Sequence, residues 1–171
     1  MKYGIAPNLS IRDNIASIYL ENQKFKKGLF LNTRELNKFV DQCIEEFEIA
    51  CTGSSSSVKF LSGGNIQKVI IAREFCSGAN FILANQPTRG IDIGTTDLIR
   101  RLLVRYTREK GYGSLLISSD LNEIMEVSDR LLVMHKGKFV AQFTDLKKLT
   151  TDELGEYMLG VKTMTKEEMG D

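Results

Sequence analysis

Apolar residues recur along the first half of the chain with the spacing of helices. Between Leu36 and Phe47 they return every three or four positions, and acidic residues fill the opposite face. This pattern predicts an amphipathic helix that begins near Thr33. A second segment, Asn65 to Cys76, is apolar on most sides and predicts a buried helix. The serine run after Gly53 predicts a loop between the two helices.

Short apolar runs alternate with helical segments in the second half. Strands are predicted at 81–84, 114–117 and 130–134, and helices at 95–109 and 120–127. This alternation is typical of a parallel α/β sheet. Lys136-Gly137 stands between two apolar runs, which predicts that the last strand turns back as a hairpin.

Two hydroxyl residues, each followed three positions later by an acid, predict helix starts near the two ends of the chain. The pairs are Ser10 with Asp13, and Thr150 with Glu153. We expect the first helix to extend to about Tyr19 and the second to Leu159. The remaining residues, Lys162 to Asp171, are predicted to form a polar tail.

Composition narrows the class of protein. The 171 residues suffice for about one domain, and 23 basic against 22 acidic residues give a net charge of +1, which offers no electrostatic case for nucleic acid. No apolar run approaches the ~20 residues of a membrane span, so direct membrane insertion is not expected. The first residues lack a signal-peptide pattern.

Cysteine and histidine content disfavours several kinds of site. Cys43, Cys51 and Cys76 are odd in number and include no C-x-x-C pair, and His135 is the single histidine. A disulfide scaffold, a zinc finger and a histidine-based triad are therefore disfavoured, and no metal site is predicted. We expect Cys43 and Cys76 to be small core residues without redox chemistry.

The segment Leu61-Ser62-Gly63-Gly64-Asn65 places a hydroxyl and two unobstructed amides at the start of a helix. Unpaired N–H groups and the helix dipole attract an anion there. Taken alone, the segment fits a helix cap followed by a tight turn better than an anion site. Further motifs downstream favour the anion-facing interpretation.

One predicted strand ends in Asn85-Gln86-Pro87-Thr88-Arg89-Gly90-Ile91-Asp92, and another ends in Ser118-Ser119-Asp120. In order and spacing these motifs resemble the C-terminal part of an ABC-type ATPase domain, a P-loop NTPase. The likeness is strongest to the second nucleotide-binding domain of fused ATP-binding subunits of sugar and nucleoside importers. Leu61 to Lys68 and Pro87 to Gly90 are typical of that group.

The resemblance implies an α/β fold with a helical subdomain at 1–77, a partial ATPase core with a parallel sheet and terminal hairpin at 78–160, and the tail at 161–171. In that fold the strand preceding the phosphate loop lies between the strands expected at 114–117 and 130–134. Without it, we expect either direct pairing of these two strands or an exposed apolar edge.

The resemblance also assigns roles to individual residues. The signature motif, which contacts ATP held by the opposite domain of a dimer, corresponds to Ser62, Gly63, Gly64 and Asn65. The D-loop corresponds to Gly90, Ile91 and Asp92. We expect Gly64 to face that partner and not the core.

Three positions depart from the family pattern. Asn85 replaces an aspartate that helps to hold magnesium, Gln86 replaces the glutamate that activates water, and Ser119 replaces the switch histidine. Loss of a general base costs on the order of 10²- to 10⁴-fold in rate. The sequence also contains no G-x-x-x-x-G-K-[ST] phosphate loop, so the resembled region begins after it and the chain alone is predicted to be inactive.

These features predict a degenerate ATP-binding subunit of an importer for simple sugars or nucleosides. ATP and Mg²⁺ are expected only in a complex with a phosphate-loop-bearing ATPase domain, and transmembrane permease subunits are expected partners at the cytoplasmic face of the membrane. Two alternatives stay open. One is a non-enzymatic remnant that binds a membrane subunit or another protein, and the other is the C-terminal head of a DNA-repair or chromosome ATPase.

Overall fold

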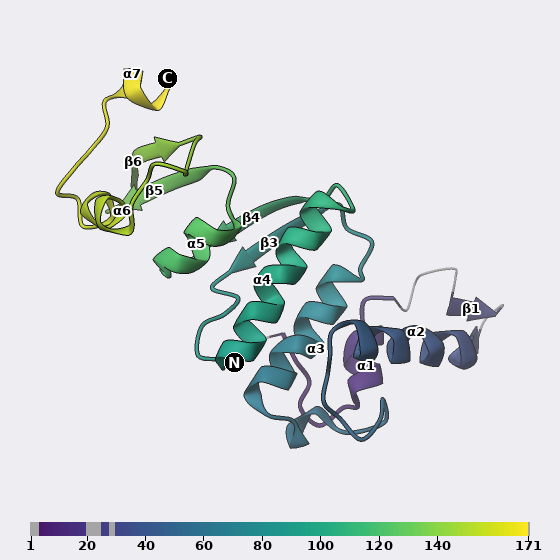
Figure 1. Cartoon of the computed structure of the whole chain (residues 1–171). Helices are drawn as coiled ribbons and strands as arrows, with labels where there is room; N and C mark the ends of the chain where they lie inside the picture. The colour runs from purple at the N-terminus through teal and green to yellow at the C-terminus, as the bar shows by residue number, and fades with distance from the viewer. Residues whose placement is uncertain (1–3, 20–24, 28–29, 171) are drawn as a thin grey trace. The chain divides into compact units, whose positions relative to one another are not determined.

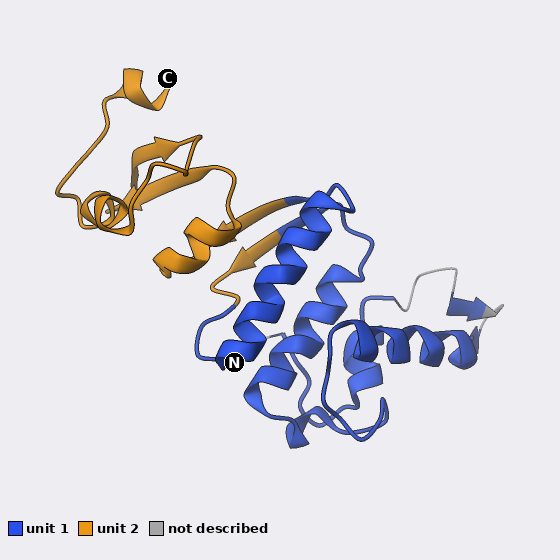
Figure 2. Cartoon of the chain, viewed as in Figure 1, with its two compact units in different colours: residues 1–82, 88–113 blue, residues 83–87, 114–171 orange. Residues whose placement is uncertain are grey.

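A computed structural model describes residues 4–19, 25–27 and 30–170. These residues form two compact units (Figure 2). Unit 1 comprises Met1–Ile82 and Thr88–Gly113, and unit 2 comprises Leu83–Pro87 and Ser114–Asp171. The predicted boundaries after residues 77 and 160 follow sequence motifs and not compactness in space, and they stay a prediction.

Unit 1 is mainly helical (Figure 1). Its elements are α1 (Ile11–Ala16), β1 (Lys26–Lys27), β2 (Phe30–Leu31), α2 (Thr33–Glu46), a 3₁₀ turn (Val58–Phe60), α3 (Gly63–Phe75) and α4 (Ile93–Arg108), with β1 antiparallel to β2. Ser10 caps α1 as predicted, since its hydroxyl accepts the backbone N–H of Asp13. The helix ends before the predicted Tyr19 because the Ser17 hydroxyl donates to the Asn14 carbonyl and closes the last turn.

The core of unit 1 lies between its helices. α1 packs on α2 and α3, and α3 packs on α4. Three buried aromatic residues from these elements meet edge to face: the rings of Phe75 and Tyr106 are 4.7 Å apart, and those of Phe47 and Phe75 are 6.1 Å apart. Edge-to-face pairs add to the hydrophobic free energy of burial, so this cluster fixes α3 against its neighbours.

Two strand pairs complete the fold. β3 (Phe81–Asn85) pairs with β4 (Gly113–Ile117). The pairing is parallel, as predicted: the N–H of Gly113 donates to the Asn80 carbonyl, and the N–H of Gln86 donates to the Ile117 carbonyl. β5 (Leu131–His135) and β6 (Lys138–Phe143) form the predicted antiparallel hairpin, whose turn residues Lys136 and Gly137 both have positive φ.

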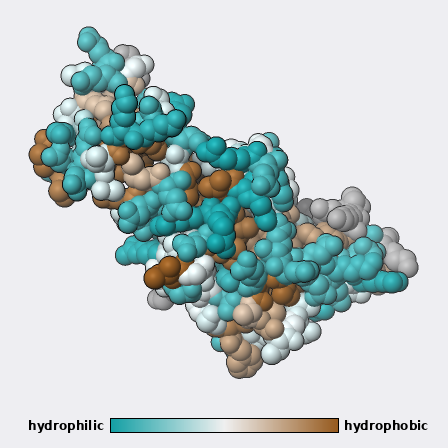
Figure 3. Space-filling view, viewed as in Figure 1, coloured by the Kyte–Doolittle hydropathy of each residue, from teal (hydrophilic) through white to brown (hydrophobic). Residues whose placement is uncertain are grey.

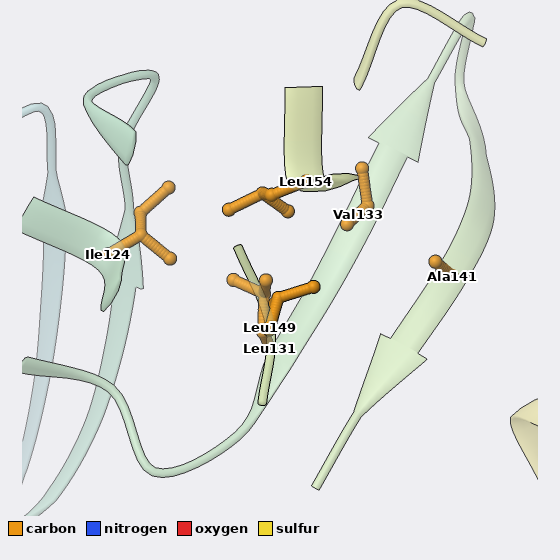
Figure 4. Close-up of a cluster of buried hydrophobic side chains, with 6 residues drawn as sticks. All are labelled: Ile124, Leu131, Val133, Ala141, Leu149 and Leu154. Atoms are coloured by element: carbon orange, nitrogen blue, oxygen red, sulfur yellow. The ribbon is translucent and has the colours of Figure 1, made fainter. Parts of the chain in front are cut away.

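Unit 2 has its own small core. Helices α5 (Leu121–Val127) and α6 (Thr151–Met158) pack with the β5–β6 hairpin. Figure 4 shows its buried side chains, which are Ile124, Leu131, Val133, Ala141, Leu149 and Leu154. Leu131 and Val133 point to this cluster, whereas the alternate residues of β5 are exposed.

The predicted polar tail contains structure. Met164 packs against the unit 2 core, and its N–H donates to the Val140 carbonyl. A short helix follows, α7 (Lys166–Met169), because Thr165 and Glu168 form a reciprocal capping box. Hydroxyl and acid at this spacing are the same signal that predicted the earlier helix starts. Asp171 lies outside the described residues.

Two faces of the strands remain uncovered among the described residues. β4 and β5 belong to different two-stranded sheets, so the direct pairing of these two strands is not seen in the described residues, and an exposed apolar edge stays a prediction. Leu83 and Ile117 on the β3–β4 pair are exposed, as are Leu132 and Met134 on β5. Figure 3 shows apolar residues reaching the surface among hydrophilic ones. Within the described segments, no helix has both the length and the apolar character to cross a membrane.

Candidate functional site

The signature segment forms the N-terminus of α3. Ser62 is the N-cap in an extended conformation, and its hydroxyl oxygen accepts hydrogen bonds from the backbone N–H and the side-chain amide of Asn65. A serine hydroxyl that accepts still has its own proton to donate. The first N–H groups of the helix have no partner within the helix itself, so the end of α3 presents donors and a positive dipole.

Asn65 braces this segment against the preceding loop. Its side-chain oxygen accepts the N–H of Ala50 at 2.8 Å, while its amide nitrogen donates to Ser62 Oγ at 3.0 Å. Both ends of the amide therefore bond within the chain. The geometry gives Asn65 a positioning role in this segment, and its contact with a partner's nucleotide stays a prediction.

The two glycines of the motif differ in their surroundings. Gly63 is exposed, and a Cβ atom added there would meet no atom within 4 Å. Gly64 is buried, and a Cβ there would lie 2.7 Å from Oδ2 of Asp92 and 2.8 Å from Oγ1 of Thr95. The expectation that Gly64 faces outward to a partner is wrong, because the start of α4 occupies the space beside it.

The D-loop residues lead into α4. Gly90 has a φ of +75°, which glycine adopts without strain. Ile91 is half-buried, and Asp92 caps the helix by accepting the N–H and the hydroxyl of Thr95, both at 2.9 Å. α4 therefore begins at Ile93, ahead of the predicted Thr95. These hydrogen bonds hold the pKa of Asp92 below its usual value, and the bond from the Thr95 backbone N–H contributes most.

Thr95 is the site-forming residue that sequence reasoning missed. It contacts both the Asp92 carboxylate and the space beside Gly64, and so links the D-loop to the signature motif. The Asp-x-x-Thr spacing could have signalled the cap. The contact with Gly64 joins distant parts of the chain and has no local signal.

The positions of the expected catalytic residues lie in unit 2. Asn85 ends β3 and is exposed, and Gln86 follows it with a φ of +50°, which non-glycine residues rarely adopt. The side-chain amide of Gln86 approaches Ser119 Oγ at 3.4 Å. The structure thus brings Gln86 and Ser119 together after β3 and β4.

These three residues carry no charge. Amides and a hydroxyl supply neither a carboxylate for magnesium nor a general base near neutral pH. Among the described residues, no cluster of three or more His, Cys, Asp or Glu could hold a metal ion. The residues at the ends of β3 and β4 therefore do not fit a magnesium ion.

No protein-family model matches the chain, but its curated relatives are ATP-binding proteins of importers. It is 37% identical over 84% of its length to the glucose import ATP-binding protein TsgD13 of Haloferax volcanii, covering 26% of that protein. It is 35% identical over 92% of its length to the nucleoside import ATP-binding protein NupA of Lactococcus lactis, covering 31% of that protein. The chain thus spans under a third of the length of either relative.

Solved structures support the fold. The ATP-binding cassette MJ0796, in a dimer bound to ADP and phosphate, aligns with a TM-score of 0.69 at 23% identity, over 85% of this chain and 60% of the cassette. An inward-facing ABC transporter described as metal-chelate type aligns with a TM-score of 0.74 at 18% identity, over 97% of this chain and 67% of that one. At these identities the likeness establishes the fold alone.

Proposed function

We propose that this chain is a partial nucleotide-binding domain whose signature segment contacts ATP held by a partner domain. The premise is that the chain is a homologue of the ATP-binding subunits of sugar and nucleoside ABC importers. The single observation that supports this most is the open N-terminus of α3. Ser62 and Gly63 are exposed there, and Asn65 joins Ser62 to the backbone of Ala50. A terminal phosphate can approach Gly63 without meeting a side chain.

Energetics favour contact with nucleotide over independent binding of it. An anion at a helix N-terminus gains about 0.3 to 2 kcal/mol, whereas millimolar affinity requires about 4 kcal/mol. The sequence has no phosphate loop to supply the difference. ATP and Mg²⁺ are therefore held by a phosphate-loop-bearing ATPase domain, and this chain completes that site from the opposite side.

In this role the chain does not hydrolyse ATP at a site of its own. Asn85, Gln86 and Ser119 lack the charge and basicity that phosphoryl transfer to water uses. The chain works in an importer for simple sugars or nucleosides, with permease subunits at the inner face of the cell membrane. Asn85-Gln86 before Pro87 favours the nucleoside type. In this proposal the chain corresponds to the C-terminal part of the second nucleotide-binding domain of such a subunit.

A second candidate function rests on the exposed apolar strand faces. Leu83, Ile117 and Met134 are exposed on unit 2, and such surface favours protein association without nucleotide. In this alternative the chain is a non-enzymatic remnant that binds a permease or another protein. ATP dependence of association separates the two functions.

The test measures association of this chain with purified NupA, with and without Mg-ATP. Gly63→Glu puts a carboxylate at the open end of α3, and we expect it to weaken ATP-dependent association at least about tenfold by charge repulsion. Gly155→Glu is the matched control, because Gly155 is also a helical glycine with no atom within 4 Å of an added Cβ. Association that needs no ATP, or that Gly63→Glu leaves unchanged, would contradict the proposal.

A further inference from the structure

Two cysteines of unit 1 lie side by side in the folded chain. Cys43 is in the last turns of α2, and Cys76 is the C-cap of α3, 33 positions further along the sequence. Their sulfur atoms are 3.4 Å apart, and the Cys43 thiol donates to the Cys76 sulfur. Both are free thiols. A disulfide bond of about 2.05 Å would need the sulfurs to approach by roughly 1.4 Å.

The two thiols differ in access and acidity. Cys43 is 2% exposed, whereas Cys76 is half-buried and reachable from solvent. The hydrogen bond from Cys43 lowers the pKa of Cys76 against burial and the Glu46 carboxylate, which raise it, and the Tyr106 hydroxyl and the Lys110 ammonium add to the lowering. The same hydrogen bond, together with burial, raises the pKa of Cys43. Cys76 is therefore the sulfur that reacts first with an external reagent.

We propose that Cys43 and Cys76 are a redox-active dithiol, which a small-molecule disulfide oxidises to a bridge between α2 and the end of α3. The Cys76 thiolate attacks one sulfur of the reagent, forming a mixed disulfide and releasing one thiolate. The Cys43 thiolate then attacks the Cys76 sulfur and releases the second thiolate. Two protein thiols are oxidised, the reagent is reduced to two thiols, and the two thiol protons end on those products.

The bridge would join the C-terminal end of the helix whose N-terminus carries Ser62 to the amphipathic helix α2. Between the cysteines lie the end of α2, the serine-rich loop and the whole of α3. Closing a loop of this kind restricts the unfolded chain and stabilises the fold. We expect oxidation to raise the midpoint of thermal unfolding by roughly 5–10 °C.

The experiment equilibrates the full chain with mixtures of reduced and oxidised glutathione, then alkylates free thiols and measures intact mass. We expect two thiols to disappear together, and a non-reducing digest to contain a peptide pair joined at Cys43 and Cys76. Cys51→Ser is the control, because Cys51 belongs to neither helix and its removal should leave this titration unchanged.

Two variants test the order of attack. Cys43→Ala should trap one glutathione on Cys76, because the neighbouring thiol that would resolve the mixed disulfide is absent. Cys76→Ala should leave Cys43 free of glutathione, because Cys43 is buried. The proposal is overturned if both thiols of the unmodified chain stay alkylatable in excess oxidised glutathione, or if the bridge that forms includes Cys51. Glutathione on Cys43 in Cys76→Ala would overturn the assigned order.

Discussion

In unit 1 the signature segment packs closely against the start of α4 and bonds to the preceding loop, whereas in unit 2 two of the three expected catalytic positions meet through one long hydrogen bond. Asp92 accepts from Thr95 twice at 2.9 Å, and Gly64 fits against both residues. Gln86 and Ser119 approach each other only to 3.4 Å. The segment proposed to face a partner's phosphate is braced by these contacts, whereas the positions proposed for hydrolysis carry amides and a hydroxyl in place of the charged groups of the family pattern. This contrast supports a donor of the signature motif over an independent ATPase.

Substitution of Gly64 should give the largest change in stability. Gly64→Ala puts a methyl group within 3 Å of Asp92 and Thr95, and overpacking of this kind costs typically about 1–3 kcal/mol. Urea unfolding followed by circular dichroism measures the loss. Gly63→Ala is the matched control, because its Cβ meets nothing and its stability should be unchanged or slightly raised. Equal effects of the two variants would show that the Gly64 contact is not tight.

Relief of backbone strain at Gln86 should give a smaller change of opposite sign. Gln86 has a φ of +50°, and glycine adopts this region without the steric cost that other residues incur. We expect Gln86→Gly to raise the free energy of unfolding by about 0.5 kcal/mol. Asn85→Gly, at the adjoining strand position, should lower it instead, because glycine there only adds entropy to the unfolded chain. Destabilisation by both variants would mean that the Gln86 side chain contributes more than its weak contact suggests.

Local signals explain what the sequence could predict. The caps at Ser10 and Thr150 and the Lys136-Gly137 turn act within a few residues, and the structure has all three. Apolar periodicity likewise placed α2 and the strands, because burial on one face dictates the spacing. The family motifs were found after two predicted strands, and Gln86 and Ser119 lie close together because the ends of parallel strands share one edge of a sheet.

Contacts between distant segments explain what the sequence could not predict. Gly64 was expected to face outward because its motif says nothing of Asp92 and Thr95, which enter the site from the start of another helix. The approach of Cys43 to Cys76 depends in the same way on how α2 packs against α3. Periodicity identifies a buried position, but it does not identify the neighbour.

Acid should weaken unit 1 in part through Asp92. The folded-state pKa of this carboxyl lies below its ordinary value of 3.8, chiefly because of the Thr95 backbone N–H. The stabilisation is therefore complete above the ordinary pKa and is lost as the pH falls through the lower, folded-state pKa. Asp92→Asn retains an acceptor without a titrating proton, so its free energy of unfolding should fall less steeply below about pH 4. Parallel acid profiles for the two proteins would contradict the assigned pKa direction.

Restoring the family carboxylates in unit 2 should have no effect on catalysis by the chain alone. Asn85→Asp with Gln86→Glu recreates the charged pair after β3, but neither carboxylate would have a nucleotide to act on, because the sequence holds no phosphate loop. The N-terminus of α3 gains too little from an anion to substitute for that loop. Phosphate release from Mg-ATP should stay at the background rate for both the double variant and the unmodified chain. Measurable turnover by the double variant would mean that this chain holds ATP through residues other than those assigned. Unit 1 would then not act only as a donor of the signature segment, and unit 2 would not be a degenerate catalytic site.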